Sequence, residues 1–96
     1  MNLGTTIKNL RKKQGFTQEY FANKCGITQT YLSQIENNLK EPNLSKLKEI
    51  SESLQVPLPI IFFLSLDEND VQPEKREAFK MVNPSVKSFV DEFFKA

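Results

Sequence analysis

The stretch from 17 to 36, with the sequence TQEYFANKCGITQTYLSQIE, constrains the fold of this chain more than any other. Thr17 and Thr28 can each cap a helix, because a threonine oxygen accepts a hydrogen bond from a free amide of the first turn. Gly26 lies between the two segments, where a sharp turn out of a helix usually needs a positive φ angle. Apolar residues recur at helical spacing on both sides of this glycine. The stretch therefore predicts two short helices, about 18–25 and 29–37, joined by a tight turn.

Hydrophobic spacing predicts three further helices around this pair. The first covers about residues 1–14, and the fourth follows Asn43, which is a good N-cap. The fifth, about 58–65, is apolar on nearly every side, so we expect it to be buried all round. Asn37 and Asn38 stop the third helix, because asparagine tolerates the left-handed conformation better than other residues with a side chain.

A polar, acidic break at residues 67–72 predicts a linker between a domain of residues 1–66 and a helical tail of residues 73–96. Pro73 can open one tail helix that runs to about residue 81. The pair Asn83 and Pro84 predicts the start of a second tail helix, with proline at its first position. In that second helix the apolar residues follow helical spacing without a miss: Val86, Phe89, Val90, Phe93 and Phe94.

Composition argues against several classes of function. The chain has a single cysteine, Cys25, and no histidine, so it has no intrachain disulfide and lacks the usual ligands of a zinc site. We expect no enzyme, because no histidine is present to activate Cys25 and there is no glycine-rich phosphate loop. The longest apolar run, 57–64, is too short to span a bilayer. We therefore expect a cytoplasmic protein without a metal or cofactor.

The formal net charge of +1 is divided unevenly along the chain. Residues 1–57 carry eight Lys and Arg against five Glu, which gives 8 − 5 = +3. Residues 58–96 carry five basic against seven acidic residues, which gives 5 − 7 = −2. Charge alone does not separate a nucleic-acid binder from a protein with an ordinary solvated surface.

Two short helices with a glycine in the turn between them form a helix-turn-helix, whose second helix can enter the major groove of DNA. The run TQEYFANKCGITQTYLSQIENN, with Arg11 before it and the apolar series from Pro42 to Val56 after it, resembles the XRE-type helix-turn-helix family of phage Cro and repressor proteins. The resemblance covers about residues 3–64. It implies an all-α fold, with a five-helix lambda-repressor-like DNA-binding domain followed by a short helical C-terminal tail.

The resemblance also implies roles for individual residues. Gln18 matches the glutamine that holds a DNA phosphate and braces the recognition helix. Arg11 and Glu36 match an ion pair between the first and third helices. The family commonly has glycine where this chain has Asn38, so the loop after the third helix can follow its own path. The predicted base contacts are Gln29, Thr30, Ser33 and Gln34, and the predicted backbone contacts are Gln18, Asn37, Asn38, Lys40, Lys8 and Lys12.

Side-chain chemistry agrees with these roles. Glutamine can pair bidentately with adenine, and the methyl group of threonine suits the methyl group of thymine, so we expect a preference for A·T pairs under Gln29 or Gln34. Tyr31 can either pack between helices or touch a phosphate. Cys25 is expected to be a small buried side chain.

Together these features predict a sequence-specific regulator of transcription that binds double-stranded DNA as a dimeric repressor. The tail offers a pairing surface, because its apolar side is too large to leave in water. Two alternatives stay open. The tail can instead fold back on its own domain, or the chain can be an antitoxin or antirepressor type of module whose tail holds another protein. The predicted dimerisation residues are Phe89, Val90, Phe93 and Phe94.

Overall fold

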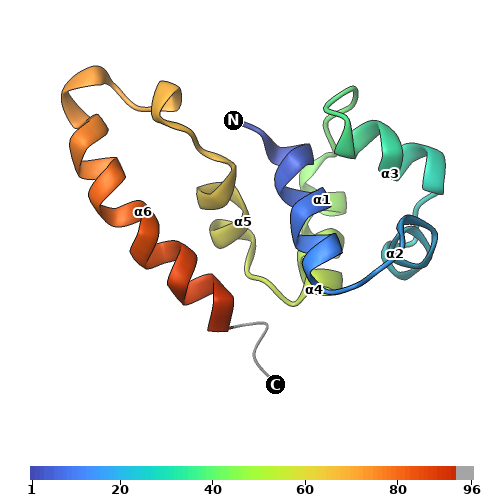
Figure 1. Ribbon diagram of the computed structural model, residues 1–96. Coiled ribbons are helices and arrows are strands. Elements are labelled where there is room, and N and C mark those ends of the chain that lie inside the picture. Colours follow the sequence, from blue (N-terminus) through green and yellow to red (C-terminus); the bar gives the residue numbers. More distant parts are fainter. Residues whose placement is uncertain (93–96) are drawn as a thin grey trace.

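The computed structural model describes residues 1–92, which form helices and turns without a strand (Figure 1). The predicted all-α fold is therefore confirmed. Two short 3-10 helices, η1 and η2, separate the last two α-helices. In chain order the elements are α1 (Leu3–Lys13), α2 (Gln18–Cys25), α3 (Gln29–Glu36), α4 (Leu44–Leu54), α5 (Leu58–Ser65), η1 (Glu68–Asp70), η2 (Pro73–Lys75) and α6 (Arg76–Asp91).

Side-chain caps set the starts of three helices, as the sequence predicts. The Thr17 hydroxyl accepts a hydrogen bond from the Tyr20 amide at 3.1 Å, and the Thr28 hydroxyl accepts one from Tyr31 at 3.0 Å. Asn43 caps α4 in the same way. Gly26 ends α2 at a φ of 70°, in the left-handed region that glycine adopts without a side-chain clash. The turn between α2 and α3 is thus fixed by local chemistry at both of its ends.

The core lies around α1, which packs against α3 on one side and α5 on the other, while α2 packs against α3 and α4 (Figure 1). Full burial of one aliphatic or phenylalanine side chain contributes about 1.5–3 kcal/mol, so this cluster holds the short helices in place. α2 and α3 could not form alone, because helices of eight residues are marginal in water. The buried apolar residues are Ile7, Leu10, Phe21, Ala22, Cys25, Leu32, Ile35, Leu47, Ile50, Leu54, Val56, Ile61 and Val90.

α5 is less buried than its composition predicts. Only Ile61 and Ser65 are fully buried, and the remaining large side chains of this helix are half-buried. The neighbouring helices each cover only a part of α5. α1 and α4 pack against one part, and Phe79 of α6 contacts Phe63 in another part, with 5.9 Å between the ring centroids. The expectation that α5 is buried all round was therefore wrong.

The tail forms one helix where the sequence predicts two. Pro73 opens the short η2, and α6 then runs from Arg76 through Pro84 to Asp91 without a break. A proline inside a helix removes a hydrogen bond and crowds the preceding turn, at a cost of about 3 kcal/mol. Packing on both sides of the proline offsets this cost, because Phe79 contacts α5 and Val90 is only 3% exposed. The predicted start of a second tail helix at Asn83 and Pro84 was therefore wrong, because packing against distant parts of the chain keeps α6 continuous.

Residues 67–72, predicted as a linker, hold a 3-10 turn that is bonded to the start of the chain. The Asp70 carboxylate pairs with the Met1 ammonium at 3.0 Å, and the Asn2 amide donates to the Ser65 carbonyl at 2.8 Å. The Arg76 guanidinium donates to the Glu68 carbonyl at 2.8 Å. These bonds set the direction in which the chain leaves α5 toward α6.

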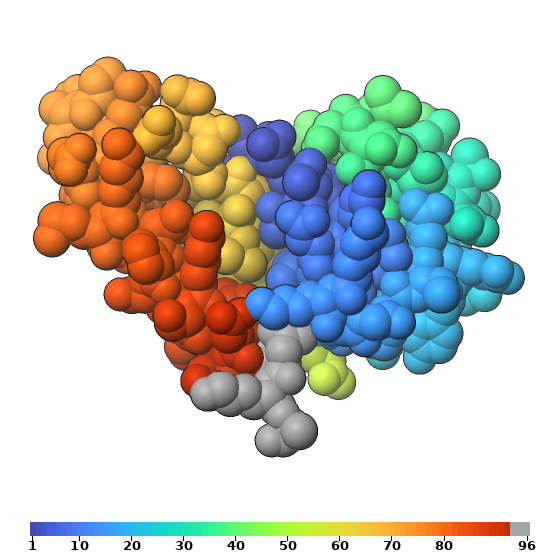
Figure 2. Space-filling model, viewed as in Figure 1, coloured from blue at the N-terminus to red at the C-terminus, as the bar shows by residue number. Residues whose placement is uncertain are grey.

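α6 and α3 lie at opposite sides of a flat molecule that measures 42 × 33 × 19 Å (Figure 2). Figure 2 shows α6 along the left side, the blue residues of α1 in the middle and α3 on the right. The tail therefore leaves the outer side of α3 uncovered.

Candidate nucleic-acid interface

α3 has one side in the core and one side open to solvent. Leu32 and Ile35 are no more than 1% exposed and anchor the inner side. On the outer side Gln29 and Thr30 are exposed, and Ser33 and Gln34 are half-buried. These four predicted base contacts line one shallow hollow together with Gln18 of α2. The structure therefore brings together on one surface the residues that the sequence assigns to base reading.

A buried ion pair lies directly behind this hollow. The Arg11 guanidinium donates to the Glu36 carboxylate through Nε at 2.7 Å and through Nη2 at 3.0 Å. The two side chains are only 8% and 2% exposed. A third donor of Arg11 reaches the Phe16 carbonyl at 2.8 Å, so the pair joins α1, the following turn and α3. Removal of either partner would leave a buried charge uncompensated.

Hydrogen bonds continue from this pair to the surface of α3. The Gln18 amide nitrogen donates to Oε1 of Glu36 at 3.2 Å, and the Gln29 amide nitrogen donates to Oε1 of Gln18 at 3.3 Å. The sequence-based assignment of Gln18 as a brace for the recognition helix is consistent with these contacts. The bond between Gln18 and Gln29 was not foreseen, although both side chains are long and lie at the starts of adjoining helices.

Asn38 has a structural task that sequence reasoning missed. Its φ of 59° lies in the left-handed region, as expected for the residue that stops α3. Its side-chain oxygen accepts from the Gly4 amide at 3.1 Å, and its side-chain nitrogen donates to the Thr5 hydroxyl at 3.2 Å. Asn2, at the N-cap position of α1, makes no side-chain cap, so Asn38 supplies one from 34 residues away. Glycine at this position would keep the turn and lose the cap.

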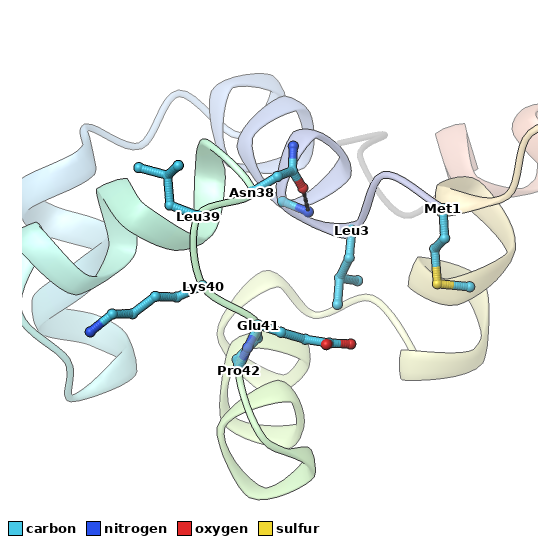
Figure 3. Close-up of a pocket in the computed structure, with 8 residues that line it drawn as sticks. Met1, Leu3, Asn38, Leu39, Lys40, Glu41 and Pro42 are labelled. Atoms are coloured by element: carbon cyan, nitrogen blue, oxygen red, sulfur yellow. Dashed lines mark hydrogen bonds between the residues drawn. The ribbon is translucent and has the colours of Figure 1, made fainter.

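Of the other predicted backbone contacts, Lys40 lies exposed in the loop that follows α3. Figure 3 shows Asn38 turned toward α1, while Leu39 and Lys40 extend away from it. Lys40 is exposed in the loop after α3, and Leu39 beside it is 75% exposed. Asn37 already donates to the Ser33 carbonyl at 2.9 Å within its own helix. The exposed Leu39 was also missed, although an apolar residue inside a polar loop is a visible signal in the sequence.

Lys8 and Lys12 lie on α1, with Lys8 half-buried and Lys12 exposed. Neither lysine lines the hollow beside α3. Their predicted contact with the DNA backbone therefore rests on the sequence resemblance alone.

Of the predicted dimerisation residues, Val90 is buried in the structure and Phe89 is exposed. Val90 lies in the core of its own chain, as the alternative of a folded-back tail implies, and an ion pair between Lys13 and Asp91 holds the same end of α6 to α1. Val90 is therefore not available to a partner with α6 in this position. Phe89 is 55% exposed. Phe93 and Phe94 lie outside the described residues.

The Cys25 thiol is held in its neutral form. Burial raises the pKa of the Cys25 thiol, the hydrogen bond with Ser53 opposes this shift only in part, and Cys25 stays a thiol at neutral pH. Within residues 1–92 no three candidate ligands come close enough together to hold a metal ion. Within the same residues, no helix has the length and hydrophobicity to cross a membrane.

Two capped helices around a glycine turn, with the outer side of the second uncovered, define a helix-turn-helix protein. The chain belongs to the helix-turn-helix family, because the family's sequence profile, described as Helix-turn-helix, matches residues 7–61.

Three similar proteins give this assignment detail. The HTH-type transcriptional regulator SinR of Bacillus subtilis (strain 168) is 38% identical over 55 residues, which are 56% of this chain and 50% of SinR. The immunity repressor protein of Bacillus phage phi105 is 33% identical over 61 residues, covering 64% of this chain and 42% of the repressor. The crystal structure of the restriction-modification controller protein C.Esp1396I aligns with a TM-score of 0.60 at 32% identity, over 66% of this chain and 83% of that one. The chain spans about half the length of SinR, and less of the phage repressor.

Proposed function

We propose that this protein binds double-stranded DNA in a sequence-specific manner and regulates transcription, with α3 in the major groove. One observation carries the proposal: side chains on the outer side of α3 and at the start of α2 line one polar hollow, and the inner side of α3 is anchored in the core. A major groove of about 12 Å admits an α-helix that presents such side chains to the base edges. The names of SinR and the phage repressor, which denote regulators, agree with this role.

Base reading falls to the four residues on the outer side of α3. Gln29 and Gln34 carry amides that can accept from and donate to one base, which favours adenine. Thr30 adds a methyl group and a hydroxyl to the lining of the hollow, and Ser33 adds a second hydroxyl.

Backbone contacts hold the helix in register without reading sequence. Lys40 is the best-placed cation for this task, because it extends from the loop directly after α3 (Figure 3). Gln18 lies at the first position of α2, where a phosphate also benefits from the positive end of the helix dipole. Asn37, Asn38, Lys8 and Lys12 are further proposed backbone contacts, and the side chain of Asn38 is also bonded to α1.

We further propose that the protein acts as a dimeric repressor and pairs through α6. Besides its inner side, α6 has a second apolar strip at helical spacing, in which Met81, Val82 and Phe89 are 78%, 50% and 55% exposed. A symmetric contact would cover two such strips with one interface. Each copy would then read one half-site, with half-sites about 34 Å apart. The alternative, a module of antitoxin or antirepressor type, would use the same strip to hold a different protein.

Selection of binding sites from random double-stranded DNA tests the proposal. Wild type is expected to enrich one short motif, repeated as two half-sites of opposite orientation. Enrichment of no motif, with equal weak binding to all sequences, would overturn sequence-specific binding. A single half-site would overturn the dimeric arrangement and leave DNA recognition in place.

A further inference from the structure

Leu39 is an apolar residue that a loop of fixed backbone geometry holds in the open. Its side chain is 75% exposed, while its own amide donates to the Gln34 carbonyl at 2.8 Å. The Lys40 amide donates to the same carbonyl at 3.2 Å, and the Asn38 amide donates to the Ile35 carbonyl at 3.0 Å. Three successive amides after α3 are therefore bonded back to the last turn of that helix.

A second set of bonds ties the same loop to α1. The Asn38 side-chain oxygen accepts from the Gly4 amide at 3.1 Å, and the side-chain nitrogen donates to the Thr5 hydroxyl at 3.2 Å. Figure 3 shows Leu39 extending from this bonded turn and away from α1. The backbone of Leu39 therefore has a set position relative to Gln34, although its side chain belongs to a loop.

The place of Leu39 indicates which partner its side chain suits. A single exposed leucine is common on protein surfaces, so exposure alone decides nothing. Leu39 lies directly beyond Gln34, which is the last of the proposed base contacts along α3, and directly before the exposed Lys40. The base edges in the major groove offer one apolar group, the methyl group of thymine. A leucine has no donor or acceptor for the other base edges.

We propose that Leu39 contacts the methyl group of one thymine, next to the base that Gln34 reads, and so adds a position of specificity to the half-site. This inference rests on the proposed DNA-binding function. Lys40 holds a phosphate beside this thymine, so one loop supplies a contact that depends on sequence and one that does not. The contact is expected to raise affinity about fourfold, which is the scale of one buried methyl or methylene group.

Replacement of thymine by deoxyuridine tests this contact, because it removes only the methyl group and keeps the base pair. Each thymine of the motif selected by wild type is replaced in turn, and fluorescence anisotropy gives the affinity for every duplex. Wild type is expected to bind about fourfold more weakly when one thymine loses its methyl group. That thymine should lie next to the position at which Gln34→Ala loses its base preference. Leu39→Ala is expected to bind the duplexes with and without this methyl group equally.

Two further variants are controls for this measurement. Leu44→Ala removes another exposed leucine, which is 57% exposed at the start of α4 and lies outside the bonded turn. Thr30→Ser removes a methyl group on the outer side of α3 and keeps the hydroxyl. Both controls are expected to keep the dependence on the thymine that Leu39 contacts. Thermal unfolding should show that Leu39→Ala keeps the fold, since its side chain is exposed and its backbone bonds remain.

The outcomes separate this inference from the function on which it rests. A dependence on one thymine methyl group that wild type and both controls show, and that Leu39→Ala lacks, supports the contact. An equal loss of affinity by Leu39→Ala for duplexes with and without each methyl group would assign Leu39 to the sugar-phosphate backbone and overturn the proposal. A motif in which no thymine depends on Leu39 overturns it too. Both results leave sequence-specific binding in place, whereas a wild type that selects no motif overturns the proposed function and this inference with it.

Discussion

The Asn38 side-chain oxygen accepts a hydrogen bond from the Gly4 amide at 3.1 Å, across 34 residues of sequence. This bond joins the start of α1 to the loop that follows α3. It gives the first turn of α1 a cap that its own N-cap residue does not supply. The loop that carries Lys40 is therefore positioned by the same residue that stops α3.

Two substitutions of Asn38 should separate the effect of its left-handed backbone conformation from the effect of its cap on α1. Asn38→Gly keeps the left-handed conformation and loses the cap, so we expect a loss of about 0.5–1 kcal/mol in the free energy of unfolding. Asn38→Ala loses the cap and also strains the turn, so we expect about 1–3 kcal/mol. Urea denaturation measures both values. An alanine variant that is at least as stable as the glycine variant would show that the φ of 59° carries no strain.

A side chain at Gly4 should push α1 away from α3. A Cβ atom built at this position would lie 1.9 Å from the Ile35 carbonyl oxygen, which belongs to the backbone of α3 and cannot rotate away. Gly4→Ala is therefore expected to destabilise the fold by about 2 kcal/mol or more, at the upper part of the range for overpacking. Asn9→Ala, at an exposed position of the same helix, is the control and should change stability by less than about 0.5 kcal/mol. Equal stability of the two variants in urea denaturation would contradict this close packing.

Lys40→Ala should weaken DNA binding evenly across sequences. If Lys40 neutralises one phosphate, its loss should lower the slope of log affinity against log salt by about 0.9. Fluorescence anisotropy with a labelled duplex at several salt concentrations gives this slope. Lys75→Ala is the control, because Lys75 is exposed in η2 on the tail side of the molecule and should leave the slope unchanged. A change in base preference for Lys40→Ala would instead assign this residue to base reading.

Charge on the exposed strip of α6 should disrupt a dimer. Met81 is 78% exposed, so Met81→Glu is expected to leave the monomer folded while burying a charge in any symmetric contact through this strip. Sedimentation velocity should show the wild type as a dimer and Met81→Glu as a monomer at the same concentration. Gln72→Glu adds the same charge at an exposed position before α6 and should stay dimeric. A dimer that tolerates Met81→Glu would place the pairing surface elsewhere.

Acid should weaken the bonds around Asp70 in a defined range of pH. The Asp67 amide and, to a lesser degree, the Met1 ammonium lower the pKa of this carboxyl from its ordinary value of 3.8. Because the pKa is lower in the folded state, the stabilisation is present above pH 3.8 and is lost as the pH falls through the folded pKa. Asp70→Asn should therefore be less stable than wild type at neutral pH, and the difference should close below pH 3.8. Thermal unfolding over this range measures the difference in stability between the two proteins. A difference that persists at the lowest pH would show that it comes from packing and not from the charge of Asp70.

The sequence was most informative where structure is decided locally. Thr17, Thr28, Asn43 and Gly26 act within one turn of their own position, so their caps and turn could be predicted from residue type and spacing. The gathering of Gln29, Thr30, Ser33 and Gln34 follows from helical spacing on one short segment in the same way.

Features decided by distant packing could not be predicted. From the sequence alone, Pro84 indicates the start of a helix. In the folded chain, Phe79 before it and Val90 after it both pack against the domain, and the helix continues through the proline. The bond between Asn38 and Gly4 depends on how closely α1 approaches α3, and no local pattern contains that distance. The connection from Arg11 through Glu36 and Gln18 to Gln29 likewise joins three helices that meet only in the folded chain.

The most direct test of the account is the affinity of Gln29→Ala and Gln34→Ala for the motif that wild type selects from random DNA. Each variant is expected to lose base preference at its own position of the half-site, with a loss of about 1–3 kcal/mol in binding to the selected duplex. Circular dichroism and thermal unfolding should show that both variants keep the fold, since neither side chain is part of the core. Unchanged affinity and unchanged base preference in both variants would contradict the assignment of α3 as the reading helix.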